Sequence, residues 1–231
     1  MSINTIKERI KAGESLLDVE KMVYINYSIT EPDPDGKMDR IQSISTSALL
    51  HEGCALRANC SNTICSKCYA RRELNRKKKL REKMEYNTLF YTKYELTSRC
   101  IPFINSNLFR FESFGEIQNE LQVKNYYSIA RKNQHCFFVL WTKETKTIQA
   151  AREKYNLKKP GNLRIIASEY LINPQEEQKK KYTFIDKIFS VYTKEFATEH
   201  EIKINCSGKC IDCMKCYDKN NKEKYIREDL K

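Results

Sequence analysis

Eight of the ten cysteines fall in two tight groups, and these are the residues whose types and spacing could do chemistry. Thiolates at such short spacing, in a reducing compartment, favour ligation of zinc or of an iron–sulfur cluster over disulfide pairing. The first group contains Cys54, Cys60, Cys65 and Cys68, and the second contains Cys206, Cys210, Cys213 and Cys216. The sequence therefore predicts one or two metal sites.

The second group has the spacing C-x3-C-x2-C-x2-C, which places four sulfurs on one short loop. Zinc fingers and ribbons separate two C-x2-C halves by a dozen residues or more, whereas a contiguous run is typical of ligands that wrap around a cubane cluster. The spacing thus favours a [4Fe–4S] cluster, and zinc is the alternative.

In the first group, Cys60, Cys65 and Cys68 have the spacing C-x4-C-x2-C, and Cys54 lies further upstream with His51 as a reserve ligand. Three thiolates would leave one metal position open to a ligand, whereas four would close the site. The sequence leaves open whether Cys54 or Cys60 is the third ligand. It also leaves open whether the two groups share a site.

The elements that must position these cysteines alternate between strand and helix patterns. A strand over 40–45 precedes the first group, so its thiols are expected at the carboxyl end of that strand, where α/β folds gather their chemistry. The alternation predicts parallel βαβ units in a partial (β/α) barrel or an open sheet. Strands are predicted over 22–29, 108–114, 135–143, 163–167 and 184–192, and helices over 69–84, 118–133, 144–156 and the charged tail 218–231.

Composition and length set the remaining limits. The 231 residues suffice for one α/β core domain, which we place at 1–205 with an N-terminal extension over 1–38, and the cysteine segment and tail 206–231 are expected to pack on it. Neither a secretory leader nor a membrane-spanning run is evident, so a cytoplasmic location and no membrane partner are expected. The net charge of +12 favours nucleic acid or another acidic partner.

The most basic predicted element is the helix over 69–84. A solvated helix face and a phosphate-binding surface explain such a run of cations equally well. If it binds nucleic acid, the contacts would come from Arg71, Arg72, Arg76, Lys77, Lys78 and Lys79.

Four short segments, in this order, carry a resemblance to a known family. They are Cys65-Ser-Lys-Cys68-Tyr69-Ala70, Arg110-Phe111 through Gly115-Glu116, Trp141-Thr142-Lys143, and Cys216-Tyr217. Together they span roughly residues 40–217, and their order and spacing resemble the phage family named gene product 88. The chain is also similar, more distantly, to phage proteins with a core like that of radical-S-adenosylmethionine enzymes.

The resemblance implies a partial (β/α) barrel with a cluster at the top of its first strand. S-adenosylmethionine would bind the free iron, and Glu116 would contact the cofactor's amine, with Glu112 as a substitute. Lys143 and Ser168, at the ends of later strands, are further candidates for cofactor binding. The alternative for both glutamates is that they begin or cap the following helix.

The leading hypothesis is therefore a phage- or mobile-element-type iron–sulfur protein with a radical-S-adenosylmethionine-like core, served by an electron donor and acting on an unknown, perhaps nucleic-acid-related, substrate. Whether it is an enzyme stays open. The rival hypothesis is a non-enzymatic nucleic-acid-binding module whose cysteine loops are stabilised by zinc. A third is a scaffold that metal merely stabilises.

Overall fold

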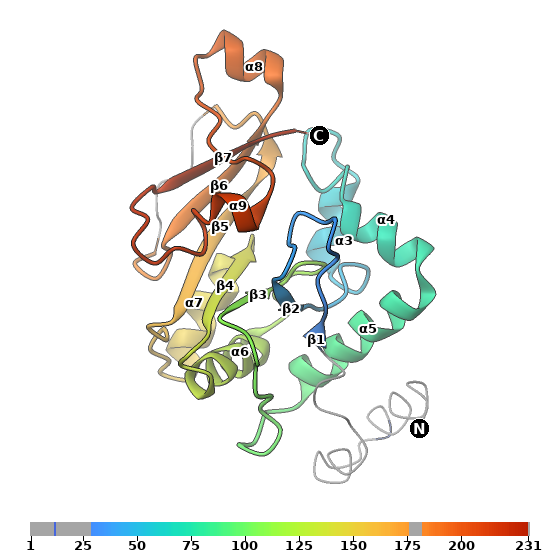
Figure 1. Cartoon of the computed structure of the whole chain (residues 1–231). Helices are drawn as coiled ribbons and strands as arrows, with labels where there is room; N and C mark the ends of the chain where they lie inside the picture. Colours follow the sequence, from blue (N-terminus) through green and yellow to red (C-terminus); the bar gives the residue numbers. More distant parts are fainter. Residues whose placement is uncertain (1–11, 13–28, 176–181, 231) are drawn as a thin grey trace.

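A seven-stranded sheet forms the centre of the protein in the computed structural model, which describes residue 12, residues 29–175 and residues 182–230. The strand order in space equals the order along the chain, as Figure 1 shows. The first strand is antiparallel to the second and all the others run parallel. The strands are β1 (Ile29–Thr30), β2 (Gln42–Ile44), β3 (Leu108–Phe111), β4 (Phe137–Thr142), β5 (Leu163–Ile172), β6 (Lys187–Tyr192) and β7 (Tyr225–Asp229).

Sequential order of parallel strands is the connectivity of (β/α) barrels and differs from that of doubly wound sheets, where the order reverses at a switch point. Within the described ranges β1 and β7 do not pair, so the sheet stays open. The predicted α/β class is confirmed. The predicted partial barrel takes the form of an open mixed sheet within the described residues. None of the described helices is long and apolar enough to span a membrane.

Helices fill the connections between the strands. The link from β2 to β3 contains α3 (Glu52–Ala58), α4 (Tyr69–Arg76) and α5 (Lys78–Lys93), whereas α6 (Glu120–Lys132) leads to β4 and α7 (Thr145–Lys154) leads to β5. After β6 come α8 (Lys194–Glu199) and α9 (Cys210–Cys213). Helix α6 begins where the Asn119 side chain accepts the N–H of Gln122, with Glu120 in its first turn and two cations in its last.

The two faces of the sheet differ in what covers them. Phe109 and Phe111 of β3 point into the main apolar core, together with Tyr126 and Ile129 of α6. Because side chains alternate along a strand, Arg110 lies on the opposite face. There, Ile41, Val139 and Ile166 pack against Tyr217, with Met214 and two cysteines of the second group at the margin. The C-terminal cysteine segment thus lies on the face away from the main helices (Figure 1).

Several predicted boundaries need correction. The tail is not helical: Tyr225–Asp229 is strand β7, because it pairs in parallel along β6. The predicted helix over 69–84 breaks at Lys77, whose extended backbone separates α4 from α5, and α5 then continues to Lys93. Strand β3 ends at Phe111, β6 begins only at Lys187, and β5 continues past 167 to Ile172. Of the predicted strand over 22–29, residues 22–28 lie outside the described residues.

Candidate functional site

The first cysteine group lies at the carboxyl ends of the parallel strands, as predicted. Helix α3 follows β2 and carries Cys54 in its first turn. His51 caps this helix, because its Nδ1 accepts the N–H of Cys54 at 3.0 Å. With Nδ1 accepting, the ring proton lies on Nε2, which donates to the carbonyl of Ile117 at 3.0 Å. Both nitrogens of the proposed reserve ligand are therefore engaged.

The four thiols of the first group have unlike surroundings. Cys65 is 7% exposed, Cys54 and Cys68 are half-buried, and Cys60 is exposed with its thiol directed at the carbonyl of Leu56, 3.8 Å away. Burial raises the pKa of Cys54 to about 12, and the carboxylate of Glu116 acts in the same direction. Cys54, and not Cys60, is therefore the thiol that faces the interior of the site.

The loop that carries Cys60 and Cys65 is fixed to a strand far from β2. Ile64 N–H donates to the carbonyl of Tyr170 at 2.9 Å, and Ile172 N–H donates to the carbonyl of Asn62 at 2.9 Å. Together with the pairing of Ile172 with Val191 of β6, these bonds accompany the extension of β5 to Ile172. The loop therefore crosses the top of the sheet from β2 to β5.

Beneath the first group lies the connection from β3 to α6, residues 112–118, which we call the floor loop. The Tyr69 hydroxyl donates to the carbonyl of Ser113, and the Tyr69 ring packs edge-on against Phe114 at 5.8 Å between centroids. Gly115 lies so close to Thr46 that a Cβ there would be 2.2 Å from the Thr46 carbonyl oxygen. The floor loop thus joins β2, the cysteine loop and α6.

Glu112, a predicted cofactor ligand, is a buried member of this floor. Its carboxylate accepts from Tyr126 Oη at 2.5 Å, Gln122 Nε2 at 2.6 Å and the Thr46 N–H at 3.1 Å. Burial raises its pKa to about 8 despite these donors. Its backbone has φ of 58°, the left-handed region that non-glycine residues rarely adopt. The side chain joins β2 to α6 and does not cap the helix.

Glu116, the second predicted ligand, bridges the ends of β3 and β4. Its carboxylate accepts from the Thr142 hydroxyl, from the Lys143 N–H at 2.9 Å and from the Ile117 N–H at 3.0 Å. Burial raises the pKa of Cys54, and the Lys143 charge opposes this effect, so Lys143 lies within electrostatic reach of that thiol. Glu116 and Lys143 thus lie within electrostatic reach of Cys54.

Ser168 lies elsewhere. It sits in β5 beside Phe189 of β6, and its hydroxyl is directed at the carbonyl of Glu169. No described hydrogen bond joins it to the residues around Cys54.

The second cysteine group is held on the open face of the sheet by two buried cations. The Arg164 guanidinium donates to the carbonyls of Asp218 at 2.8 Å and Cys216 at 3.1 Å. Lys187, which is 2% exposed, donates to Asn221 Oδ1 at 2.7 Å and to the Asn221 carbonyl at 3.1 Å. Charged donors to carbonyls make strong hydrogen bonds, so the segment has a defined seat on β5 and β6.

The four thiols of this group influence one another. Burial raises the pKa of Cys216 to about 12, and the charges of Cys210, Cys206 and Cys213 add to that effect. Gly208 N–H donates to the sulfur of Cys206, which stabilises a thiolate there, and Gly208 has φ of 81°. This donor set fits a soft metal in its chemistry.

The described positions of the cysteine side chains do not by themselves form a complete metal site in either group. Within the described ranges, no three His, Cys, Asp or Glu side chains lie close enough together to hold one metal ion. Ligation would therefore require the thiols to converge from the positions described above.

Arg110 is a residue of this region that the sequence analysis named only as part of a motif. Its guanidinium lies 4.1 Å from the centroid of the Trp141 ring, and no carboxylate among the described residues pairs with it. Burial raises the pKa of Cys210 and of Tyr69, and the Arg110 charge opposes burial in both cases. Arg110 therefore lies within electrostatic reach of Cys210 in the second group and of Tyr69, which follows Cys68 of the first group. In the sequence, Arg110 lies between Phe109 and Phe111 of β3, and a cation between two core residues is the signal that could have singled it out.

The predicted basic surface on α4 and α5 is largely solvated. Glu73 pairs with Arg76 and Lys77 at 2.9 Å each. Arg71 donates to the carbonyl of Ala48, and Arg72, Lys78 and Lys79 are exposed.

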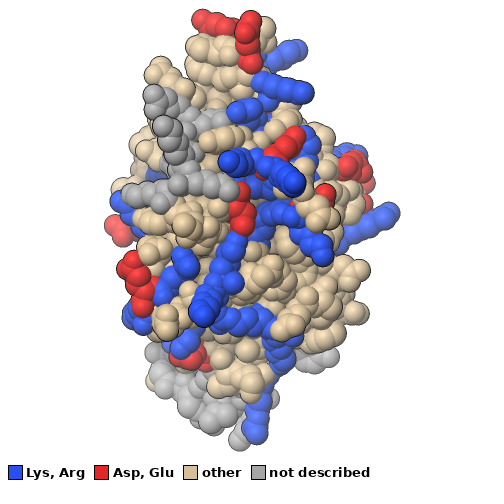
Figure 2. All heavy atoms as spheres, turned by 90° about the vertical axis from the view of Figure 1, so that its left-hand side faces the viewer, with Lys and Arg blue, Asp and Glu red and all other residues tan. Residues whose placement is uncertain are grey.

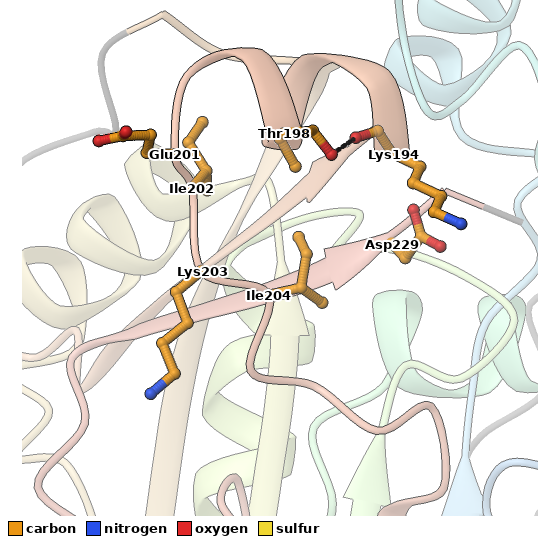
Figure 3. Close-up of a pocket in the computed structure, with 8 residues that line it drawn as sticks. Lys194, Thr198, Glu201, Ile202, Lys203, Ile204 and Asp229 are labelled. Atoms are coloured by element: carbon orange, nitrogen blue, oxygen red, sulfur yellow. Dashed lines mark hydrogen bonds between the residues drawn. The ribbon is translucent and has the colours of Figure 1, made fainter.

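A shallow hollow of about 380 Å³ lies between α8 and the end of β7 (Figure 3). Its lining includes Ile202, Ile204, Lys194 and Asp229, and Figure 3 shows Lys194 and Asp229 on the same side of it. None of the predicted site residues lines it.

Comparison with protein families gives one match, to the family described as gene product 88, over residues 28–224. This range contains both cysteine groups and the strands from β1 to β6. The comparison with curated proteins and the comparison with solved structures each give no significant match.

Proposed function

We propose that this chain, which belongs to the gene product 88 family, is an iron–sulfur protein that binds metal through both cysteine groups. The first group, at the carboxyl ends of the strands, would hold a cluster with one position open to S-adenosylmethionine, and the second would hold an auxiliary site. The match to a phage family agrees with a phage-type protein, and it does not itself bear on metal or cofactor.

The observation that carries the proposal is the convergence of both cysteine groups on one region of a sequential parallel sheet. The first group spans the strand tops from β2 to β5, and the second is seated on the adjoining open face by Arg164 and Lys187. Arg110 lies within electrostatic reach of Cys210 in the second group and of Tyr69 beside the first group, without a carboxylate partner among the described residues. Since metal–thiolate centres are anionic, a cation at this position would offset their charge.

The residues have separate roles in this proposal. Cys65, Cys68 and Cys54 would be the ligands of the open site, because Cys60 is exposed and turned toward Leu56. Glu116 and Lys143 would contact the polar groups of S-adenosylmethionine. When bound, a reduced cluster would supply the electron for cleavage of S-adenosylmethionine. Glu112 accepts the Thr46 N–H and so supports the floor loop. It would hold this loop in place and would not itself contact the cofactor.

The test is the metal and acid-labile sulfide content of protein purified without oxygen, together with its absorption spectrum. We expect iron and sulfide, with the double variant C65A/C68A losing one cluster and C210A/C213A losing the other. C136A is the matched control, because Cys136 is a buried core thiol outside both groups. Its iron content should equal that of the unaltered protein.

The same preparation tests the cofactor. Reduced protein should release 5′-deoxyadenosine from S-adenosylmethionine, and E116Q should weaken cofactor binding without lowering the iron content. Colourless protein that contains zinc and no sulfide would overturn the iron–sulfur proposal in favour of zinc-stabilised loops. Iron–sulfur protein that neither binds nor cleaves the cofactor would overturn the open-site assignment alone.

A further inference from the structure

We propose that the amino-terminal edge of the sheet, opposite the tops of the strands, binds a single-stranded nucleic acid. This surface, which we call the amino edge, is formed by the loops before β3, β4 and β5. Its residues are Arg99, Phe103, Arg131, Lys132, His135 and Lys158.

Hydrogen bonds join the three loops into one surface. Asn133 is fully buried, its Nδ2 donates to the carbonyl of Pro102 at 2.9 Å, and its Oδ1 accepts the Ile104 N–H at 2.8 Å. Asn162 Nδ2 donates to the carbonyls of Ala130 at 2.9 Å and Asn133 at 3.1 Å. The loops therefore present their side chains from a fixed framework, which reduces the entropy lost on binding.

The same bonds place the cations of the amino edge beside one another. Lys132 Nζ donates to the carbonyls of Ser98 at 2.8 Å and Ile101 at 2.9 Å, and Arg131 donates to the carbonyl of Lys158 at 2.6 Å. Lys132 thus adjoins the loop of Arg99, and Arg131 adjoins Lys158.

None of these four cations forms an ion pair with a described carboxylate. Lys159 nearby differs, because Asp186 pairs with it at 2.6 Å. The lower half of Figure 2, which views the side of the molecule that carries α7, shows Lys and Arg side chains in a run with few Asp and Glu. A polyanion can therefore displace counterions here without competing against internal carboxylates.

An exposed aromatic pair completes the surface. Phe103 is 64% exposed, although large apolar side chains are normally buried. It stacks on the ring of His135, with 5.2 Å between ring centroids and 28° between planes. His135 is itself held by a 2.7 Å bond from Nε2 to the carbonyl of Ile104. The outer face of Phe103 is thus free for a base, which favours unpaired nucleotides over a duplex.

The experiment measures fluorescence anisotropy of a labelled oligo-dT and a labelled oligo-U of about 12 nucleotides, the site size of a small binding surface. We expect F103A to weaken binding by about fivefold to about a hundredfold, the range for loss of one stacked base, with an unchanged salt dependence. R99E/K158E should weaken binding at least tenfold and should lower the slope of log K against log salt by about 1.4, for two lost phosphate contacts.

The matched control is K194E/K203E beside the hollow next to α8, which alters net charge equally at two exposed cations. Neither Arg99 nor Lys158 uses its side chain in a described hydrogen bond, so R99E/K158E should keep the fold, and thermal unfolding checks this. The proposal is overturned if the control weakens binding as much as R99E/K158E, or if F103A binds unchanged. It is equally overturned if duplex DNA or poly-glutamate binds as tightly as the oligonucleotides. A chelator should leave this binding intact, which separates it from the metal sites.

Discussion

The two cysteine groups adjoin one sheet, but the protein holds them by different means. The loop of the first group connects β2 to β5 through backbone hydrogen bonds, such as that from Ile64 N–H to the Tyr170 carbonyl. It also contacts the floor loop through the Tyr69 hydroxyl. The second is seated by the side chains of Arg164 and Lys187, which reach the backbone after Cys216.

The two groups also differ in how far their thiols are exposed to solvent. In the first group Cys65 is buried and Cys60 is exposed, whereas all four thiols of the second group are half-buried. Unequal exposure suits a site in which one position stays open to a ligand, and equal surroundings suit a closed site. The difference therefore supports the division into an open and an auxiliary site, and three substitutions can break or sharpen it.

The largest effect is expected for G115A in the floor loop. A Cβ at Gly115 would be 2.2 Å from the Thr46 carbonyl oxygen and 2.5 Å from a carboxylate oxygen of Glu112. Backbone atoms cannot yield as a flexible side chain can, so we expect a loss of about 3 kcal/mol or more in the free energy of unfolding, measured in urea.

The matched control for this change is G161A. An added Cβ at Gly161 meets no atom within 4 Å, so this variant should lie within about 1 kcal/mol of the unaltered protein. In G115A, alkylation of Cys65 should accelerate more than that of Cys216, because only the first group rests on the floor loop. Equal acceleration of both thiols would show that the two groups share one support.

A smaller effect is expected for K187M, which removes one anchor of the second group. The substitution leaves the carbonyl of Asn221 and its Oδ1 without their charged donor, at a cost of about 2–3 kcal/mol. Trypsin cleavage after Lys215 and Lys219 should accelerate, as followed by mass spectrometry. The control is K219M, an exposed position where we expect less than about 0.5 kcal/mol. If K187M and K219M unfold at the same urea concentration, Lys187 does not anchor the segment.

Much of this architecture follows from local patterns. The apolar spacing and flanking charges of 118–133 predict α6 because its core face is set by residues a turn apart, such as Tyr126 and Ile129. The unbroken apolar run after His135 predicts a buried parallel strand, and β4 is one. The order of these elements is enough to place Cys54 near Glu116, because each residue follows a parallel strand of the same sheet.

What the sequence could not supply depends on contacts between distant residues. Tyr225–Asp229 is short and charged, and only pairing with β6 makes it a strand. The extension of β5 to Ile172 depends on the pairing of Ile172 with Val191 of β6 and on the bridge from Leu171 to Thr63 of the cysteine loop. The seat of the second group required Arg164 and Lys187, which lie in strands where the sequence suggests apolar packing. When a cation is buried against a segment that comes later in the chain, the residues around it in the sequence do not indicate that contact.

A pH dependence is also expected, and it arises from the floor loop beneath the first group. Burial raises the pKa of Glu112 from 4.5 to about 8, so the folded protein binds this proton more tightly than the unfolded chain does. Stability should therefore fall as pH rises from about 4.5 to about 8, by up to about 1.4 kcal/mol per pH unit from this group.

The measurement is urea unfolding of the unaltered protein and of E112Q at about pH 5 and about pH 7. The amide of E112Q cannot titrate, so the difference in unfolding free energy between the two proteins should shift with pH in favour of E112Q at the higher value. E112D keeps a titrating carboxyl on a shorter side chain and should retain the slope, although its overall stability falls. A pH-independent difference between E112Q and the unaltered protein would mean that the Glu112 carboxyl is ionised throughout, with its four donors outweighing its burial.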